Sequence, residues 1–247
     1  MEENENILCE GINILCENDE ELNRLISPRA FDVLSQLVSY IKEIELFNPA
    51  YGLVGAKDRR ELIIKHILDS LSPAGIISRL ITEKNTKKNI ETQHVKHGVI
   101  QIADAGSGAG LPGIPLAVAM PCASFTLIEK TGRRAGFLLN TTAALPLSNT
   151  TVEENELEKT NGSFNLITFR AFKPLDFNLL KNLNRLCAPE GIIAAYKGKR
   201  EKIESEIAAL TEMTANNKQK IEWHWEVIPY TVPFLEEERC LLVIKFN

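Results

Sequence analysis

The stretch Asp104-Ala-Gly-Ser-Gly-Ala-Gly-Leu-Pro-Gly-Ile-Pro115 decides the fold of this chain. A strand-like run from Val99 to Ala103 leads into the acidic residue, and a helix-like segment follows the last glycine. Glycines in such a loop let backbone amides approach a ligand where a Cβ atom would collide. The stretch therefore predicts a strand, a cofactor-binding loop and a helix, with a structural glycine-rich turn as the alternative.

The cofactor is indicated by the chemistry of this loop. Its letters match two patterns, the dinucleotide fingerprint Gly108-x-Gly110-x-x-Gly113 and the S-adenosylmethionine loop Asp104-x-Gly106-x-Gly108-x-Gly110. A dinucleotide pyrophosphate binds free N–H groups at a helix N-terminus. Pro112 and Pro115 remove two such donors, and Asp104 would repel phosphates. S-adenosylmethionine has no phosphate and carries an ammonium group, so it is the expected cofactor.

Two acidic residues are candidates to hold that cofactor. Asp104 is expected to meet the ammonium group, and the alternative is that it caps the following turn. Glu129 ends a second strand-like run, 124–128, where an acid can accept hydrogen bonds from both ribose hydroxyls. The alternative for Glu129 is a solvated strand end without a ligand.

Bulk composition narrows the function classes. The 247 residues are 44% hydrophobic, enough for a substantial core. The net charge of −5 and the isoelectric point near 5.6 are not typical of a nucleic-acid binder, so any RNA contact needs a local basic patch. The acidic start argues against a signal peptide, and no run approaches the roughly 18 apolar residues of a membrane span. Scattered cysteines without metal-ligand spacing predict reduced thiols in the cytosol and no metal: Cys9, Cys16, Cys122, Cys187 and Cys240.

The first 80 residues are expected to be helical. Apolar residues recur at helical spacing from Phe31 to Ile44, and Pro49 and Gly52 are expected to break that pattern. A second helix is expected at about 59–71. The polar stretch 82–98 lacks periodicity and is expected to form a loop or linker. These features divide the chain into an N-terminal helical segment (1–80), an insertion or linker (81–98) and a main domain (99–247).

From residue 99 onward, strand-like and helix-like segments alternate, which predicts a parallel sheet covered on both faces. The last two strand-like runs are too close for a crossover helix, so they should form an antiparallel hairpin. Strands are expected at 99–104, 124–129, 149–153, 164–169, 190–196, 221–232 and 239–245, and helices at 114–120, 132–145, 173–187 and 199–215. This arrangement is the expected shape of an α/β, Rossmann-like seven-stranded sheet of the class I methyltransferase type, and ligands of such sheets bind beyond the carboxyl ends of the strands.

Several separated motifs together resemble one family. They are Lys65-His-Ile-Leu-Asp-Ser70, the 104–115 loop, Thr131-Gly-Arg-Arg-Ala-Gly-Phe-Leu138, Phe164-Asn-Leu-Ile-Thr-Phe-Arg-Ala-Phe172, Tyr196-Lys-Gly198 and Glu238-Arg-Cys-Leu-Leu-Val-Ile-Lys245. Over roughly residues 30–245 the chain resembles the small-subunit ribosomal RNA guanine-N7 methyltransferases, the glucose-inhibited division protein B family. The resemblance implies methyl transfer from S-adenosylmethionine to N7 of a guanine in the decoding region of 16S ribosomal RNA. The alternatives are a non-catalytic S-adenosylmethionine- or nucleotide-binding protein of the ribosome, and a methyltransferase for another substrate.

The resemblance also implies roles for residues on the cofactor side. Gly106 and Leu111 would line the cofactor, the segment of Glu156 and Leu157 would meet its adenine, and Arg170 would also contact the cofactor site. Without the resemblance, Leu111 would be assigned to the core.

Three residues are candidates for the catalytic side. Arg170 ends a buried strand, where an unpaired cation is costly, so it is expected to face the guanine or a carboxylate such as Asp104 or Glu129. His66 and Asp69 lie three residues apart on one helix face, as a functional pair or as a local structural pair. Guanine N7 has an in-plane lone pair and needs no deprotonation, so no general base is expected.

The expected partner is 16S RNA, either free or in the small ribosomal subunit. An acidic protein needs a local RNA-binding surface to contact it. Phe172 is a candidate for base stacking. A phosphate-binding rim is expected near the strand ends, although exposed lysines on a helix are usually only solvated. Its candidates are Arg133, Arg134, Lys197, Lys199, Arg200 and Lys202. No membrane partner is expected, and the sequence does not set an oligomeric state.

Overall fold

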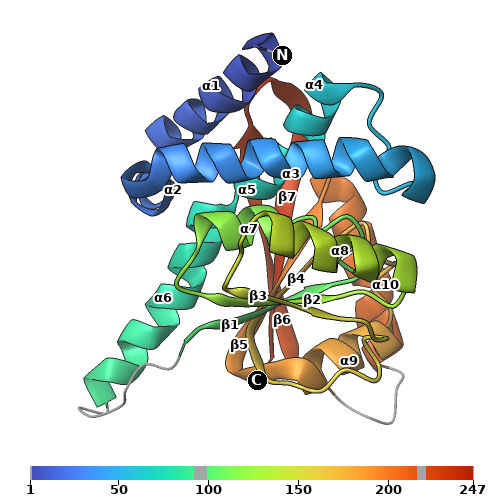
Figure 1. Ribbon diagram of the computed structural model, residues 1–247. Helices are drawn as coiled ribbons and strands as arrows, with labels where there is room; N and C mark the ends of the chain where they lie inside the picture. Colours follow the sequence, from blue (N-terminus) through green and yellow to red (C-terminus); the bar gives the residue numbers. More distant parts are fainter. Residues whose placement is uncertain (1, 92–98, 216–220, 247) are drawn as a thin grey trace.

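The computed structural model describes residues 2–91, 99–215 and 221–246, and a seven-stranded sheet forms its centre (Figure 1). The strand order is β3-β2-β1-β4-β5-β7-β6. The strands are β1 (Gln101–Ala105), β2 (Ser124–Ile128), β3 (Thr150–Glu153), β4 (Phe164–Arg170), β5 (Cys187–Lys197), β6 (Trp223–Val232) and β7 (Leu235–Phe246). Each strand overlaps its predicted range, which confirms the α/β, Rossmann-like class.

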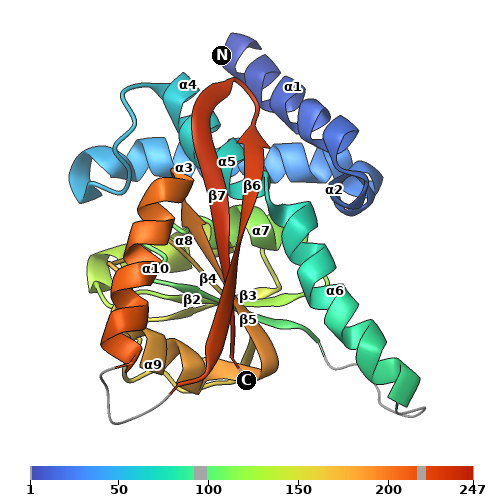
Figure 2. The same cartoon turned by 180° about the vertical axis from the view of Figure 1, so that it is seen from behind.

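The sheet is parallel except at its last strand. β1 pairs in parallel with β2 and β4, and the same direction continues to β3 and β5. β7 is antiparallel to both of its neighbours, β5 and β6. Two residues connect β6 to β7, and Phe234 turns the chain there with a φ of 65°. The predicted hairpin is therefore confirmed, and it is the long pair of strands that crosses Figure 2.

Each face of the sheet has its own hydrophobic core, because successive strand residues point to opposite sides. Ile102 packs with the N-terminal helices, α7 (Gly113–Ala119) and α8 (Gly132–Ala144). Its neighbour Ala103 packs with α9 (Phe177–Leu186) and α10 (Arg200–Ala215). Burial on both faces is what a parallel sheet requires.

Helices fill the N-terminal segment, as predicted. They are α1 (Glu2–Asn18), α2 (Glu20–Ile26), η1 (Ser27–Arg29), α3 (Ala30–Tyr51), α4 (Arg59–Leu62), η2 (Ile63–Leu68), α5 (Asp69–Leu71) and α6 (Ala74–Glu91). The expectation that Pro49 breaks the helical pattern is wrong, because α3 passes through Pro49 and continues to Tyr51. The left-handed Gly52, with a φ of 58°, ends the helix instead.

The polar stretch after residue 81 also differs from expectation. Residues 82–91 continue α6, so the predicted loop is wrong there, while 92–98 lie outside the described residues. Ala74, Ile77 and Ile81 bury the first turns of α6, and neither glycine nor proline follows to stop the helix before residue 91. The division of the chain at residues 80 and 98 stays a prediction; one hydrophobic core joins the N-terminal helices to the sheet.

Helices α1 to α5 lie across the end of the sheet at which the parallel strands finish, and α6 runs down beside the sheet (Figures 1 and 2). The last residue of β4, Arg170, contacts the helical turn of Lys65 and Asp69 there. The space between this turn and the strand ends is the edge at which α/β sheets bind ligands. No helix within the described ranges is long and apolar enough to cross a membrane.

Candidate functional site

Two neighbouring pockets open at the carboxyl edge of the sheet. The small pocket, of about 290 Å³, adjoins Gly106 and Glu129 at the ends of β1 and β2. The large pocket, of about 860 Å³, lies between the ends of β4 and β5 and the turn of His66 and Asp69. The segment Ala171–Lys173 lines both pockets and therefore forms the wall between them. Ala171 has a φ of 49°, a conformation that residues other than glycine rarely adopt and that marks a constrained backbone.

The glycine loop forms one side of the small pocket. Gly106 and Gly108 have φ values of 69° and 59°, in the left-handed region that favours glycine. A Cβ atom on Gly106 would collide with the ring of Phe172. Tyr40 of α3 holds the loop from the other side, because its buried hydroxyl donates to the carbonyl of Ala109 over 2.6 Å. A contact from a helix distant in the sequence thus fixes the loop that the glycine motif predicts.

Glu129 joins the small pocket to the loop. One carboxylate oxygen accepts the backbone N–H of Gly108 over 2.9 Å, and the other accepts that of Thr131 over 2.8 Å. The side chain is buried, so the alternative of a solvated strand end is wrong. Each oxygen keeps a second lone pair, and Glu129 lines the pocket, as contact with ribose hydroxyls requires.

Asp104 lies behind the loop, fully buried, and lines neither pocket. Its Oδ2 accepts the N–H of Gly113 over 3.1 Å, so it caps the following turn. Its Oδ1 has no hydrogen-bond partner among the described residues. Burial raises the pKa of this carboxyl group to about 7. The ammonium contact stays a prediction, and the unpartnered oxygen is the feature that supports it.

Glu156 and the buried Leu157, the segment expected to meet the adenine, also line the small pocket. Leu111 belongs to the core behind the loop, and Gly108 and Gly110 shape the backbone without lining the pocket. The pocket thus combines a glycine at the point of close approach, a buried carboxylate and the apolar side chain of Leu157. These residues fit S-adenosylmethionine.

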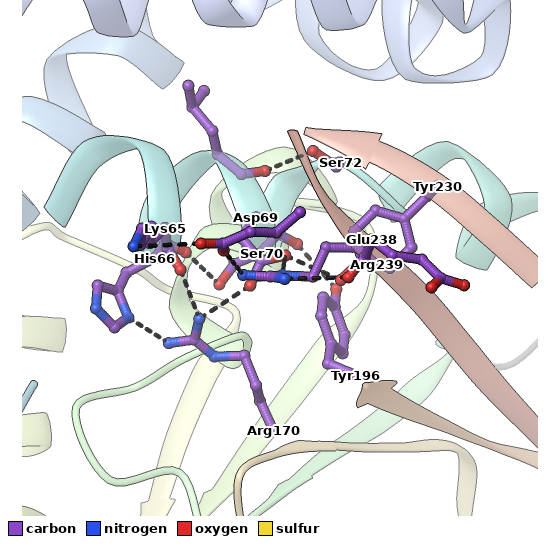
Figure 3. Close-up of polar contacts among 12 residues, drawn as sticks. Lys65, His66, Asp69, Ser70, Ser72, Arg170, Tyr196, Tyr230, Glu238 and Arg239 are labelled. Atoms are coloured by element: carbon purple, nitrogen blue, oxygen red, sulfur yellow. Dashed lines mark hydrogen bonds and ion pairs between the residues drawn. The ribbon is translucent and has the colours of Figure 1, made fainter. Parts of the chain in front are cut away.

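Arg170 points from the end of β4 into the helical turn above it (Figure 3). Its Nη1 donates to the carbonyl of Lys65 over 3.0 Å and to Oδ2 of Asp69 over 3.1 Å, while Nη2 lies 2.9 Å from Nδ1 of His66. The carboxylate partner is therefore Asp69; the expectation of Asp104 or Glu129 is wrong. Arg170 lines the large pocket and is absent from the described lining of the small one. The turn it holds, η2, has the π-helical geometry that is frequent at functional sites.

Asp69 is a buried centre of hydrogen bonds. Besides Arg170, it accepts from the hydroxyl of Tyr230 over 3.0 Å and forms an ion pair with Arg239 over 3.4 Å. The nearby Tyr196 donates to the carbonyl of Ser70 over 2.8 Å, and burial raises the pKa of both tyrosines. Sequence reasoning does not connect Tyr230 and Arg239 with Asp69, because the hairpin brings them from more than 150 residues away; Arg239 lies in the 238–245 motif, which by itself assigns it no role at the site.

His66 is half-buried and lines the large pocket. Burial and then the charge of Arg170 lower its pKa to about 4, so the ring is neutral near pH 7. No direct hydrogen bond joins it to Asp69 in the described part of the chain; Arg170 bridges the two instead. The predicted pair is thus assembled by a third residue, 104 positions away from the histidine.

The rim residues divide into different environments. Lys197 pairs with Glu206 over 2.6 Å, and Arg200 donates to the carbonyl of Val227. Arg133 lies over the ring of Tyr51, Arg134 lines the small pocket, and Lys199 and Lys202 are exposed with no ion pair found in the described ranges. The large pocket itself is lined by five cations and three carboxylates, namely Lys65, Arg170, Lys173, Lys197 and Arg239 with Glu61, Asp69 and Glu206. Its lining therefore holds two more cations than carboxylates, and each of these cations also pairs with a carboxylate.

Comparison with known proteins places this geometry in a family. The family model described as rRNA small subunit methyltransferase G matches residues 33–225. The chain belongs to this family. Relatives named Ribosomal RNA small subunit methyltransferase G are 36% identical in Treponema denticola, over 94% of this chain and 93% of the relative, and 33% identical in Escherichia fergusonii, over 86% and 89%.

The structural comparison agrees on the fold. A candidate O-methyltransferase from Klebsiella pneumoniae superposes with a TM-score of 0.55, at 15% identity, over 84% of this chain and 90% of that one. The family match covers most of α3, all of the small pocket, the large pocket except Arg239, and the first three residues of β6. Within the described residues, no group of three or more His, Cys, Asp or Glu side chains is placed to hold a metal ion.

Proposed function

We propose that this protein transfers the methyl group of S-adenosylmethionine to N7 of a guanine in the decoding region of 16S ribosomal RNA. The observation that carries the proposal is the wall shared by the two pockets at Ala171–Lys173. A cofactor in the small pocket and a base in the large pocket meet at this wall. Membership of the family supports ribosomal RNA as the substrate class.

The reaction makes few chemical demands on the protein. When bound, S-adenosylmethionine supplies an electrophilic methyl group on a sulfonium. Guanine N7 attacks with its own lone pair, so no side chain has to remove a proton. His66 and Asp69 suit this reaction because the contacts of both with Arg170 engage the atoms that a base would use. The residues align the base with the methyl group and exclude water, and such orientation contributes roughly 7–11 kcal/mol.

Each pocket has residues suited to its ligand. Glu129 accepts hydrogen bonds from the ribose hydroxyls, and Glu156 and Leu157 hold the adenine. Phe172 is half-buried at the wall, where its ring can stack on the incoming guanine. Arg170 fixes His66 and Asp69 on the substrate side.

The excess of cations over carboxylates in the lining of the large pocket favours the binding of RNA. Five basic residues line it against three carboxylates, whereas the whole chain carries a net charge of −5. Phosphates flanking the target guanine are therefore attracted to this face and repelled by the remainder of the surface. An enzyme that modifies ribosomal RNA is expected to act in the cytoplasm, where ribosomes are.

Mass-spectrometric mapping of 7-methylguanine tests the proposal. Small ribosomal subunits from cells that lack the protein are incubated with S-adenosylmethionine, with and without the purified chain. We expect one additional 7-methylguanine in the decoding region of 16S RNA. Binding of the cofactor without methylation of any RNA would favour a non-catalytic ribosome-associated protein, and methylation of a different molecule would favour another substrate.

A further inference from the structure

The hydrogen bond between Arg170 and His66 fixes which nitrogen of the histidine carries its proton. An arginine side chain has five N–H donors and no acceptor. Nη2 of Arg170 lies 2.9 Å from Nδ1 of His66, so Nδ1 must accept with its lone pair. The proton of the neutral ring is therefore on Nε2.

Nε2 is a donor that the protein leaves free. No partner for it is found in the described parts of the chain, and His66 lines the large pocket. Figure 3 shows the ring with one edge toward Arg170 and the other edge away from it. Burial, together with the charges of Arg170, Lys65 and Arg239, keeps this ring neutral, and Glu61 acts in the opposite direction. The pocket thus contains a fixed, uncharged N–H donor.

We propose that Nε2–H of His66 donates a hydrogen bond to O6 of the target guanine and thereby selects guanine over adenine. The inference rests on the proposed function of the large pocket. Guanine presents O6 and N7, two adjacent acceptors, on one edge, whereas adenine presents an N6 amino donor beside N7. A donor at Nε2 matches guanine and opposes the amino group of adenine, while N7 stays free to react.

A neutral donor suits this position better than a cation. The cofactor's sulfonium is positive, so a second positive charge close to the reacting atoms would be repelled. A cation on O6 would also withdraw more electron density from N7 than an uncharged N–H group. Arg170 directs three hydrogen bonds to Lys65, Asp69 and His66, which leaves the neutral imidazole to contact the base.

Two conservative variants separate recognition of the base from support of the structure. In His66→Asn the amide oxygen can replace Nδ1 and keep the contact with Arg170, but nothing replaces Nε2–H. In His66→Gln the longer amide can place an N–H group near the position of Nε2. Methyl transfer is measured in single turnovers on small subunits assembled with 16S RNA that carries either guanine or 2-aminopurine, which has N7 but no O6, at the methylated position.

On guanine RNA we expect His66→Asn to be slower by about tenfold, the loss of one neutral hydrogen bond, and His66→Gln to recover part of the rate. On 2-aminopurine RNA, wild type and His66→Asn should agree within about twofold, because O6 is missing from both reactions. An equal loss on both RNAs would overturn the inference and make His66 a structural residue. Absence of methylation by the wild type on guanine RNA would instead refute the proposed function. As a control, the cofactor affinity and the melting temperature of each variant are measured, and values equal to those of the wild type show that the pocket is intact.

Discussion

The ring of Phe172 lies against the Cα atom of Gly106, so closely that a single Cβ atom on the glycine would overlap the ring. The two residues come from the ends of β1 and β4, which are neighbours in the sheet although 66 positions separate the residues in the sequence. Their contact sets the wall between the cofactor pocket and the substrate pocket. A change at Gly106 should therefore disturb both ligands at once.

Gly106→Ala should weaken the binding of S-adenosylmethionine by at least tenfold, because the new methyl group displaces Phe172 into the pockets. Gly108→Ala is the matched control, since it has the same left-handed backbone but no side chain within 3.4 Å of a new Cβ atom. Both variants should lose about 1–2 kcal/mol of unfolding free energy from backbone strain. Calorimetric affinities that fall equally in the two variants would contradict the role of Phe172.

Glu129→Gln should weaken S-adenosylmethionine by about 1.5–3 kcal/mol, the value of a hydrogen bond to a charged group. It should also lower stability, because one amide N–H group of the glutamine would oppose the N–H of Gly108 or Thr131. Glu154→Gln is the control, because Glu154 is exposed, follows β3 and lies outside the pocket lining, and it should change neither quantity. An unchanged dissociation constant for S-adenosylmethionine in a folded Glu129→Gln protein would contradict the contact between Glu129 and the ribose.

Asp104 should make stability depend on pH. Its pKa rises from 3.8 in the unfolded chain to about 7 in the folded one, so the folded state holds the proton more tightly. The stabilisation is fully present below pH 3.8 and is lost as the pH rises through 7. Between pH 5 and 8, wild type should lose about 2–3 kcal/mol of unfolding free energy relative to Asp104→Asn, as measured by urea denaturation. Parallel pH profiles for the two proteins would contradict this pKa.

The same carboxyl group reports on the cofactor. If the ammonium of S-adenosylmethionine meets Oδ1 of Asp104, binding favours the carboxylate and releases a proton at pH 6.5. Calorimetry in two buffers of different ionisation enthalpy measures that release, which should disappear in Asp104→Asn. Binding without proton release in the wild type would leave Asp104 as a cap of the loop alone.

Arg170→Ala should reduce turnover more than it reduces cofactor affinity, because Arg170 lines the substrate pocket and orders His66 and Asp69. Arg170→Lys should restore little, since one amine cannot reach all three partners of the planar guanidinium. Stability should fall by about 3 kcal/mol, at the low end for a broken buried pair because Arg239 still faces Asp69. The exposed pair of Arg24 and Glu21 provides the control, and Arg24→Ala should cost less than about 1 kcal/mol. Normal turnover in Arg170→Ala would refute its role on the substrate side.

Salt should separate RNA binding from cofactor binding. The affinity for small subunits should fall steeply with salt, whereas the affinity for S-adenosylmethionine should not. Charge reversal of Lys199 and Lys202 together should reduce the slope of log affinity against log salt by about 1.4, for two phosphate contacts. Lys181→Glu on α9, which lines neither pocket, should leave the slope unchanged. Equal slopes in all three proteins would exclude these lysines from the rim.

The sequence by itself determined the order of the elements and the cofactor loop. Local signals are sufficient for both, because a strand needs only a short apolar run and a tight loop needs glycine at left-handed positions such as Gly106. The terminal hairpin also followed from the short connection between the last two strand-like runs, because no crossover helix fits between β6 and β7. Pro49 is tolerated in the last turn of α3, so only Gly52 ends that helix. α6 extends past the predicted end of the helical segment, because a polar stretch without glycine or proline can continue a helix.

The tertiary structure alone decided which side chains meet. The sequence predicts the guanine or a carboxylate such as Asp104 or Glu129 as the partner of Arg170, and nothing in it indicates Asp69. The choice depends on how the N-terminal helices lie across the sheet edge, and that placement comes from a core shared by residues far apart in the chain. Tyr230 and Arg239 reach Asp69 for the same reason, because the hairpin carries them back over the sheet. Hydrophobic burial fixes the position of whole elements without regard to sequence distance, and the pairing of charges follows from it.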